Sequence, residues 1–177
     1  TVAATRKETN EALEKNMIRL VQEMQRSGIT TFETKSGYGL TTEDETRALE
    51  IASKHTSETT FLGAHIVPSE YAGKEDKYVE LVTGEMLDSV LPHSKWIDVF
   101  CDRGAFDVDQ SRQILHAGKD KGLLPRIHAN QLTQGGGVQL AVELDCASAD
   151  HCSHLSDSDI EALAGSNTVV TLVPGAE

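Results

Sequence analysis

Apolar residues recur every three or four positions near the start of the chain, as they do along one face of an amphipathic helix. The spacing of Thr5 and Glu8 is that of a capping box and predicts the start of this helix, and Gly28 predicts its end. Its apolar face consists of Leu13, Met17, Leu20, Val21 and Met24. Similar patterns predict further helices at residues 42–55, 79–90, 107–122, 140–144 and 156–163.

Short runs of β-branched, aromatic and other apolar residues lie between these helices, and each has the length and composition of a strand. The predicted strands cover residues 29–34, 59–64, 96–100, 124–128, 146–149 and 168–173. The connections between them are too long for hairpins. Strand and helix therefore alternate, which indicates right-handed βαβ units and a parallel sheet.

Two α/β architectures fit this alternation, an open doubly wound sheet and a (β/α)8 barrel. Periodicity does not separate them, although six strands are too few for a complete barrel of eight. We expect residues 1–177 to form one domain or one piece of a domain. The chain begins with Thr1 rather than methionine and stops just after an apolar run. Both ends look cut, so we expect a segment of something longer.

Composition narrows the classes of function. The net charge is -12 with both signs spread along the chain, so the basic patch that nucleic-acid binding needs is missing. No apolar run approaches the length of a membrane span, and no secretory signal is visible. The three cysteines lack CxxC spacing, so we expect reduced thiols in a cytoplasmic protein.

Polar side chains follow successive predicted strands at the point where each strand ends. They are Tyr38, His65, Asp102, His128 and His151, in chain order. Because parallel strands present their carboxyl ends on one face of a sheet or barrel, we expect these side chains to converge on one pocket. Imidazole suits zinc or iron as a ligand and also suits proton transfer near neutral pH. Taken singly, each histidine is equally well interpreted as a hydrogen-bonded loop residue.

Several longer motifs resemble the imidazolonepropionase family, which belongs to the amidohydrolase superfamily. They occur in the family's order and cover nearly the whole chain. Together the motifs are highly specific, whereas the segment around His128 alone indicates only the superfamily. The matching segments are Lys35–Leu40, Phe61–His65 with Val67–Pro68 and Glu70–Tyr71, Asp98–Cys101, Gly104–Phe106, Gln110–Arg112, His128–Leu132, Ser148–His151 and Pro174–Ala176.

The resemblance implies an incomplete (β/α)8 TIM barrel of the amidohydrolase type, with about six βα units. It also implies metal-dependent hydrolysis of 4-imidazolone-5-propanoate to N-formimidoyl-L-glutamate, with one zinc or iron ion per subunit. By this resemblance His128 is a metal ligand and His151 orients or deprotonates the attacking water. Tyr38 and His65 contact the imidazolone ring, and Gln131 lies near the substrate, where an amide can hydrogen-bond but cannot act as a base.

Some expected parts of the family's site are missing from this chain. The family's paired histidine ligands and propionate-binding arginine should lie upstream, and its aspartate ligand should lie downstream. We therefore expect the 177 residues alone to bind metal weakly, to be inactive and to expose two sheet edges that favour aggregation. Two alternatives are a hydantoinase-like or dihydroorotase-like cyclic amidohydrolase and a non-catalytic module that binds a small molecule. We expect the protein to assemble as a homodimer.

Overall fold

A six-stranded parallel sheet forms the centre of the computed structural model, which describes residues 1–176. Each strand pairs with the strand that precedes it in the chain, so the spatial order equals the sequence order. A doubly wound sheet would reverse this order at a switch point, and no reversal occurs. The strands are β1 (Thr34–Lys35), β2 (Thr59–Ala64), β3 (Trp96–Cys101), β4 (Leu124–Ala129), β5 (Ser148–His151) and β6 (Val169–Thr171).

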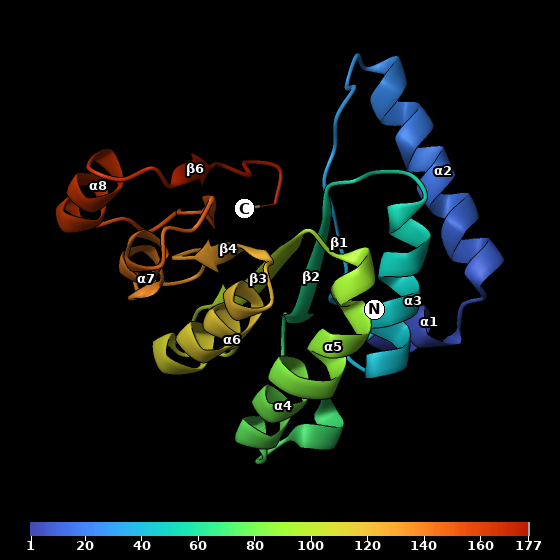
Figure 1. Ribbon diagram of the computed structural model, residues 1–177. Coiled ribbons are helices and arrows are strands. Elements are labelled where there is room, and N and C mark those ends of the chain that lie inside the picture. The colour runs from blue at the N-terminus through green and yellow to red at the C-terminus, as the bar shows by residue number, and fades with distance from the viewer. Residues whose placement is uncertain (177) are drawn as a thin grey trace.

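The sheet curls like part of a barrel wall, and helices pack along its outer side (Figure 1). This arrangement confirms the prediction of an incomplete (β/α)8 barrel with six strands. The α-helices are α1 (Val2–Lys7), α2 (Asn10–Arg26), α3 (Thr42–Ser53), α4 (Glu75–Leu81), α5 (Leu87–Val90), α6 (Val108–Asp120), α7 (Gly137–Glu143) and α8 (Asp157–Ala164). Short 3-10 helices cover Ser69–Tyr71 and Leu91–His93, and a π-helical turn covers Val82–Met86.

The apolar core lies between the sheet and the helices. Phe61, Val99 and Ile127 are buried on the outer face of three successive strands. A methyl group added at Gly118 of α6 would come within 2.6 Å of Ile97, so this helix lies directly on β3. Among the described residues, no helix is both long enough and apolar enough to cross a membrane.

Polar residues occupy the inner face of the curled sheet, where the centre of a barrel would be. Phe100, His128 and Asp150 are register partners on β3, β4 and β5, so their side chains point to the same face. Two residues earlier, Asp98 and Arg126 share that face because side chains alternate along a strand. Charged and aromatic residues thus line this side, which predisposes it to bind a polar ligand.

Several predicted boundaries differ from those observed. Thr9 rather than Thr5 caps the long helix α2, because Thr5 lies inside the separate helix α1. Of the first predicted strand, residues 29–34, only Thr34 pairs with β2, and the observed strand continues to Lys35, because β2 itself begins opposite Thr34, at Thr59. The fifth strand extends to His151, two residues beyond the prediction.

The cap of α3 also differs from the prediction. Thr41, one residue before the predicted start at Thr42, accepts a hydrogen bond from the Asp44 amide at 3.1 Å. The side chain of Glu45 turns away from the helix start and is fully buried under the loop that precedes it.

Candidate active site

Four of the five predicted site residues lie in one row above the ends of neighbouring strands. The ring of Tyr38 is 5.0 Å from that of His65, measured between centroids, and His65 is 6.1 Å from Phe100. Phe100 is 6.1 Å from His128, which is 5.2 Å from His151. The structure therefore brings the phenol and three imidazoles together, as the ends of parallel strands predict.

His128 is held by a buried carboxylate. Its Nδ1 lies 3.1 Å from Oδ1 and 3.0 Å from Oδ2 of Asp98, whose side chain is 0% exposed. A carboxylate accepts hydrogen bonds, so Nδ1 carries the proton and Nε2 remains available to a ligand. Burial acts to lower the pKa of His128, but the charge of Asp98 outweighs it and raises this pKa.

Lys35 supplies the positive charge that balances this buried carboxylate. Its Nζ lies 2.8 Å from Asp98, 2.8 Å from Glu33 and 3.6 Å from Asp150. Burial acts to lower the pKa of Lys35, but the surrounding carboxylates raise it well above its usual range. In turn, His128 and Lys35 overcome the effect of burial and hold the pKa of Asp98 well below its usual range. Lys35 is therefore positively charged and Asp98 negatively charged near neutral pH.

Asp98, His128 and Asp150 form a candidate metal site, because one ligand atom from each lies within 4.8 Å of the others. In the described part of the chain, Oδ1 of Asp150 is buried and has no hydrogen-bond partner. Such an atom is costly unless a ligand satisfies it. Asp98 already contacts Lys35 and His128, so it suits the orientation of the imidazole better than direct binding.

His151 ends β5 in an unusual backbone conformation. Its φ is +74°, and that of Cys152 is +53°, a region that non-glycine residues rarely adopt. The Cys152 amide donates a hydrogen bond of 3.1 Å to the Ala129 carbonyl at the end of β4. Strain of this kind persists only where the surroundings fix it, and it concentrates at functional sites. It turns the His151 ring toward His128.

Tyr38 and His65 form the other end of the row. Nδ1–H of His65 donates to the Gly37 carbonyl at 2.9 Å, which leaves Nε2 available toward the site. Tyr38 is 48% exposed and approaches His65 edge-on, with an interplanar angle of 88°. Gln131 is half-buried two residues after β4 and lies outside the row of rings.

Sequence reasoning missed three charged residues of this site, namely Lys35, Asp98 and Glu33. The available signal was a charged residue within an apolar run, since Asp98 interrupts the predicted strand Trp96–Phe100. From the sequence alone, Asp150 is compatible both with orienting His151 and with capping a helix. It proves to be the register partner of His128 on β5.

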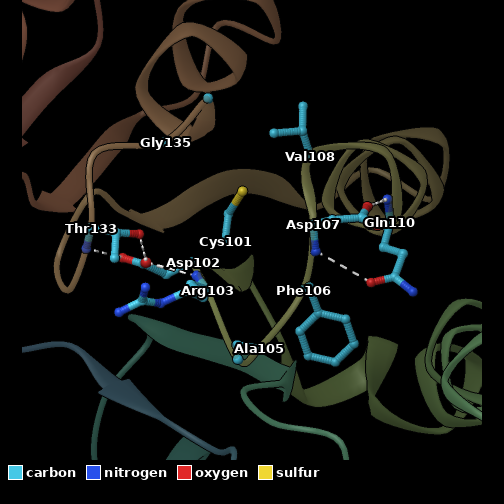
Figure 2. Close-up of a pocket in the computed structure, with 12 residues that line it drawn as sticks. Cys101, Asp102, Arg103, Ala105, Phe106, Asp107, Val108, Gln110, Thr133 and Gly135 are labelled. Carbon is cyan, nitrogen blue, oxygen red and sulfur yellow. Dashed lines mark hydrogen bonds between the residues drawn. The ribbon is translucent and has the colours of Figure 1, made fainter. Parts of the chain in front are cut away.

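Asp102, which also follows a strand, has a different role. It accepts a hydrogen bond from the Leu132 amide at 2.8 Å. It also accepts one from the Thr133 hydroxyl at 2.6 Å (Figure 2). It joins the loops after β3 and β4 beside a pocket of about 340 Å³. Asp102 is the one strand-end side chain of the predicted set that lines this pocket, so the prediction that it joins Tyr38, His65, His128 and His151 was wrong. The pocket is bordered by residues 101–108, Gln110, Thr133, Gly135 and Gly136. The row of rings is therefore the better candidate for chemistry.

Comparison with known proteins supports the family resemblance. No protein-family model matches the chain. Over 177 residues it is 66% identical to an imidazolonepropionase of Streptomyces avermitilis, 65% to one of Streptomyces coelicolor and 62% to one of Mycolicibacterium smegmatis. All of this chain is matched, and it covers 43%, 45% and 45% of those proteins, respectively. Along its whole length the chain is thus a homologue of the imidazolonepropionases, of which it spans slightly less than half.

Proposed function

We propose that a full-length protein carrying this chain opens the ring of 4-imidazolone-5-propanoate by hydrolysis and releases N-formimidoyl-L-glutamate, a step of histidine degradation. The row of rings from Tyr38 to His151 is the observation that carries the proposal. A flat substrate ring can pack against a phenol and imidazoles that converge from separate strands. The names of the relatives support the same reaction.

The residues present fit a single zinc or iron ion. Nε2 of His128 and Oδ1 of Asp150 are a nitrogen and an oxygen donor with no protein hydrogen bond to satisfy them in the described residues. Both metals accept such donors. When bound, the ion supplies Lewis acidity, which makes water acidic enough to attack a carbonyl near neutral pH. Asp98 contributes by holding the His128 ring in one orientation and tautomer.

His151 is the proposed acid–base group. It takes a proton from the attacking water while the water oxygen bonds to the carbonyl carbon of the ring amide. When the C–N bond breaks, His151 returns this proton to the departing nitrogen, so that atoms and charges balance. Its fixed backbone keeps the imidazole beside His128 throughout. Gln131 can hydrogen-bond to the substrate but has no basic site for the proton.

Tyr38 and His65 are proposed to orient the imidazolone ring. The Tyr38 hydroxyl both donates and accepts, and Nε2 of His65 presents a polar atom to the same side. Orientation of a reacting ring contributes to catalysis because it replaces a search in solution with a fixed geometry.

The test uses a full-length imidazolonepropionase that carries this chain, assayed with 4-imidazolone-5-propanoate, hydantoin and dihydrouracil. We expect ring opening of the imidazolone substrate and about one bound metal ion per subunit. His151→Ala should lower kcat by roughly 10²–10⁴-fold, the usual contribution of a positioned acid–base group. The matched control is His154→Ala, because His154 is exposed three residues later.

Each alternative predicts a different result. Turnover of hydantoin or dihydrouracil without turnover of the imidazolone would favour another cyclic amidohydrolase. Absence of metal and of all turnover would favour a binding module. Wild-type kcat in the His151→Ala variant would remove this residue from the mechanism. The cytoplasmic location and the homodimeric assembly belong to the same proposal, and light scattering of the purified protein tests the assembly.

A further inference from the structure

A buried carboxylate lies beneath the loop that carries Tyr38. Glu45 is fully buried, and its oxygens accept hydrogen bonds from the amides of Gly37 at 2.8 Å, Gly39 at 2.9 Å and Leu40 at 2.8 Å. In the part of the chain that the structure describes, no lysine or arginine is paired with it. Its oxygens therefore accept from backbone amides, which form a nest around an anion.

The backbone of this loop is shaped to bind the carboxylate. Gly37 and Leu40 have φ values of +105° and +59°, so the backbone turns its amides inward. A methyl group added at Gly39 would come within 2.3 Å of the Cβ of Asp44, so the loop also lies directly on α3. Without the Glu45 carboxylate, three inward amides would lack an acceptor, and each unsatisfied buried donor is costly.

The same loop fixes both proposed ring-binding residues. Tyr38 lies between two of the amides that Glu45 binds, and the Gly37 carbonyl accepts the Nδ1–H bond of His65. We propose that Glu45 is a positioning residue that sets Tyr38 and His65 for the substrate ring without touching the substrate. This inference rests on the proposed function, because it gives Tyr38 and His65 their role.

The test is Glu45→Gln in a full-length imidazolonepropionase that carries this chain. Oε1 accepts two of the three hydrogen bonds and Oε2 accepts the third, so an amide must direct its NH₂ at a backbone N–H in either orientation. We expect KM to rise by roughly tenfold or more, with kcat changed by less than about threefold and metal content unchanged, the pattern of a lost binding interaction. Glu43→Gln, an exposed position on the same helix, should leave both constants unchanged.

Two further measurements separate positioning from a general loss of structure. In a Tyr38→Ala, His65→Ala background, Glu45→Gln should raise KM little further, because its effect passes through those two side chains. If Glu45→Gln does not fold, Gly39→Ala decides, since it displaces the same loop while the carboxylate remains. It should show the same selective rise in KM.

Specific outcomes would overturn the proposal. An unchanged KM in a folded Glu45→Gln variant would do so, as would an equal loss of kcat and metal content. If Glu45→Gln does not fold, an unchanged KM in the Gly39→Ala variant would overturn the proposal. If the wild-type protein does not open the imidazolone ring at all, the proposed function fails instead, and the two failures are thus distinguished.

Discussion

Replacing Lys35 by methionine tests whether the ammonium of Lys35 stabilises the inner face of the sheet. Methionine keeps most of the side-chain volume but removes a charge 2.8 Å from both Glu33 and Asp98. Asp98 is fully buried, and Asp150 is nearly so, at 8% side-chain exposure. The variant therefore leaves three carboxylates close together with His128 and Arg126 as the nearby basic groups.

The expected cost follows from burial. Removal of one partner of a buried ion pair destabilises a protein by about 3–5 kcal/mol, because the other charge stays buried without compensation. The Lys35 side chain is 23% exposed, so water partly screens it, and we expect the lower end, about 3 kcal/mol. Urea unfolding of a full-length imidazolonepropionase that carries this chain, freed of metal, measures this difference.

Lys54→Met is the matched control. Its ammonium lies 3.3 Å from Glu14 and its side chain is 57% exposed, so we expect a loss of less than about 1 kcal/mol. If Lys35→Met also costs less than about 1 kcal/mol, the inner-face charges are effectively solvated, and our reasoning about a buried network is wrong.

Three further predictions concern the site and its surroundings. Asp98→Asn should weaken metal binding by about 10–100-fold, as measured by competition with a chelator, because it loosens the His128 ring. Burial acts to raise the pKa of Asp102, but its hydrogen bonds from Thr133, Leu132 and Arg103 outweigh this effect and lower it. The contribution of Asp102 to stability is therefore present above the ordinary pKa of 3.8 and lost as pH falls below it. The protection of the Leu132 amide from hydrogen exchange, relative to its intrinsic exchange rate at the same pH, should therefore fall in acid, and Asp102→Asn should remove this pH dependence. The thiols should resist iodoacetamide at pH 7 until the protein unfolds, because all three are buried and burial raises their pKa, in Cys152 to about 11.

The strand and helix order could be predicted because each element has its own periodicity. The strand Thr59–Ala64 was confirmed at the residues predicted, and the helix predicted from residue 107 has Asp107 as its N-cap. The barrel could not be separated from an open sheet by periodicity, because both have the same local pattern and differ only in which strands become neighbours. The family resemblance supplied that information, and the sequential strand order confirmed it.

The convergence of Tyr38, His65, His128 and His151 could be predicted from their places at strand ends. The pairing of Lys35 with Asp98 could not be predicted, since the two are 63 residues apart in the sequence and no local pattern indicates such a contact. The buried position of Glu45 could not be predicted either, because its carboxylate binds amides of the loop that precedes its own helix. The metal ligation by His128 and the substrate contacts of Gln131 stay predictions.

The strictly sequential strand order has a consequence for how this chain is made. Each new strand docks on one that has already left the ribosome, so no segment needs a later one before it can pair. The sheet can therefore form in the order of the chain, and the helix that follows each strand packs against it in turn. A translational pause after any of these units would leave unpaired only the two edge strands of the partial sheet, rather than a scattered set of segments.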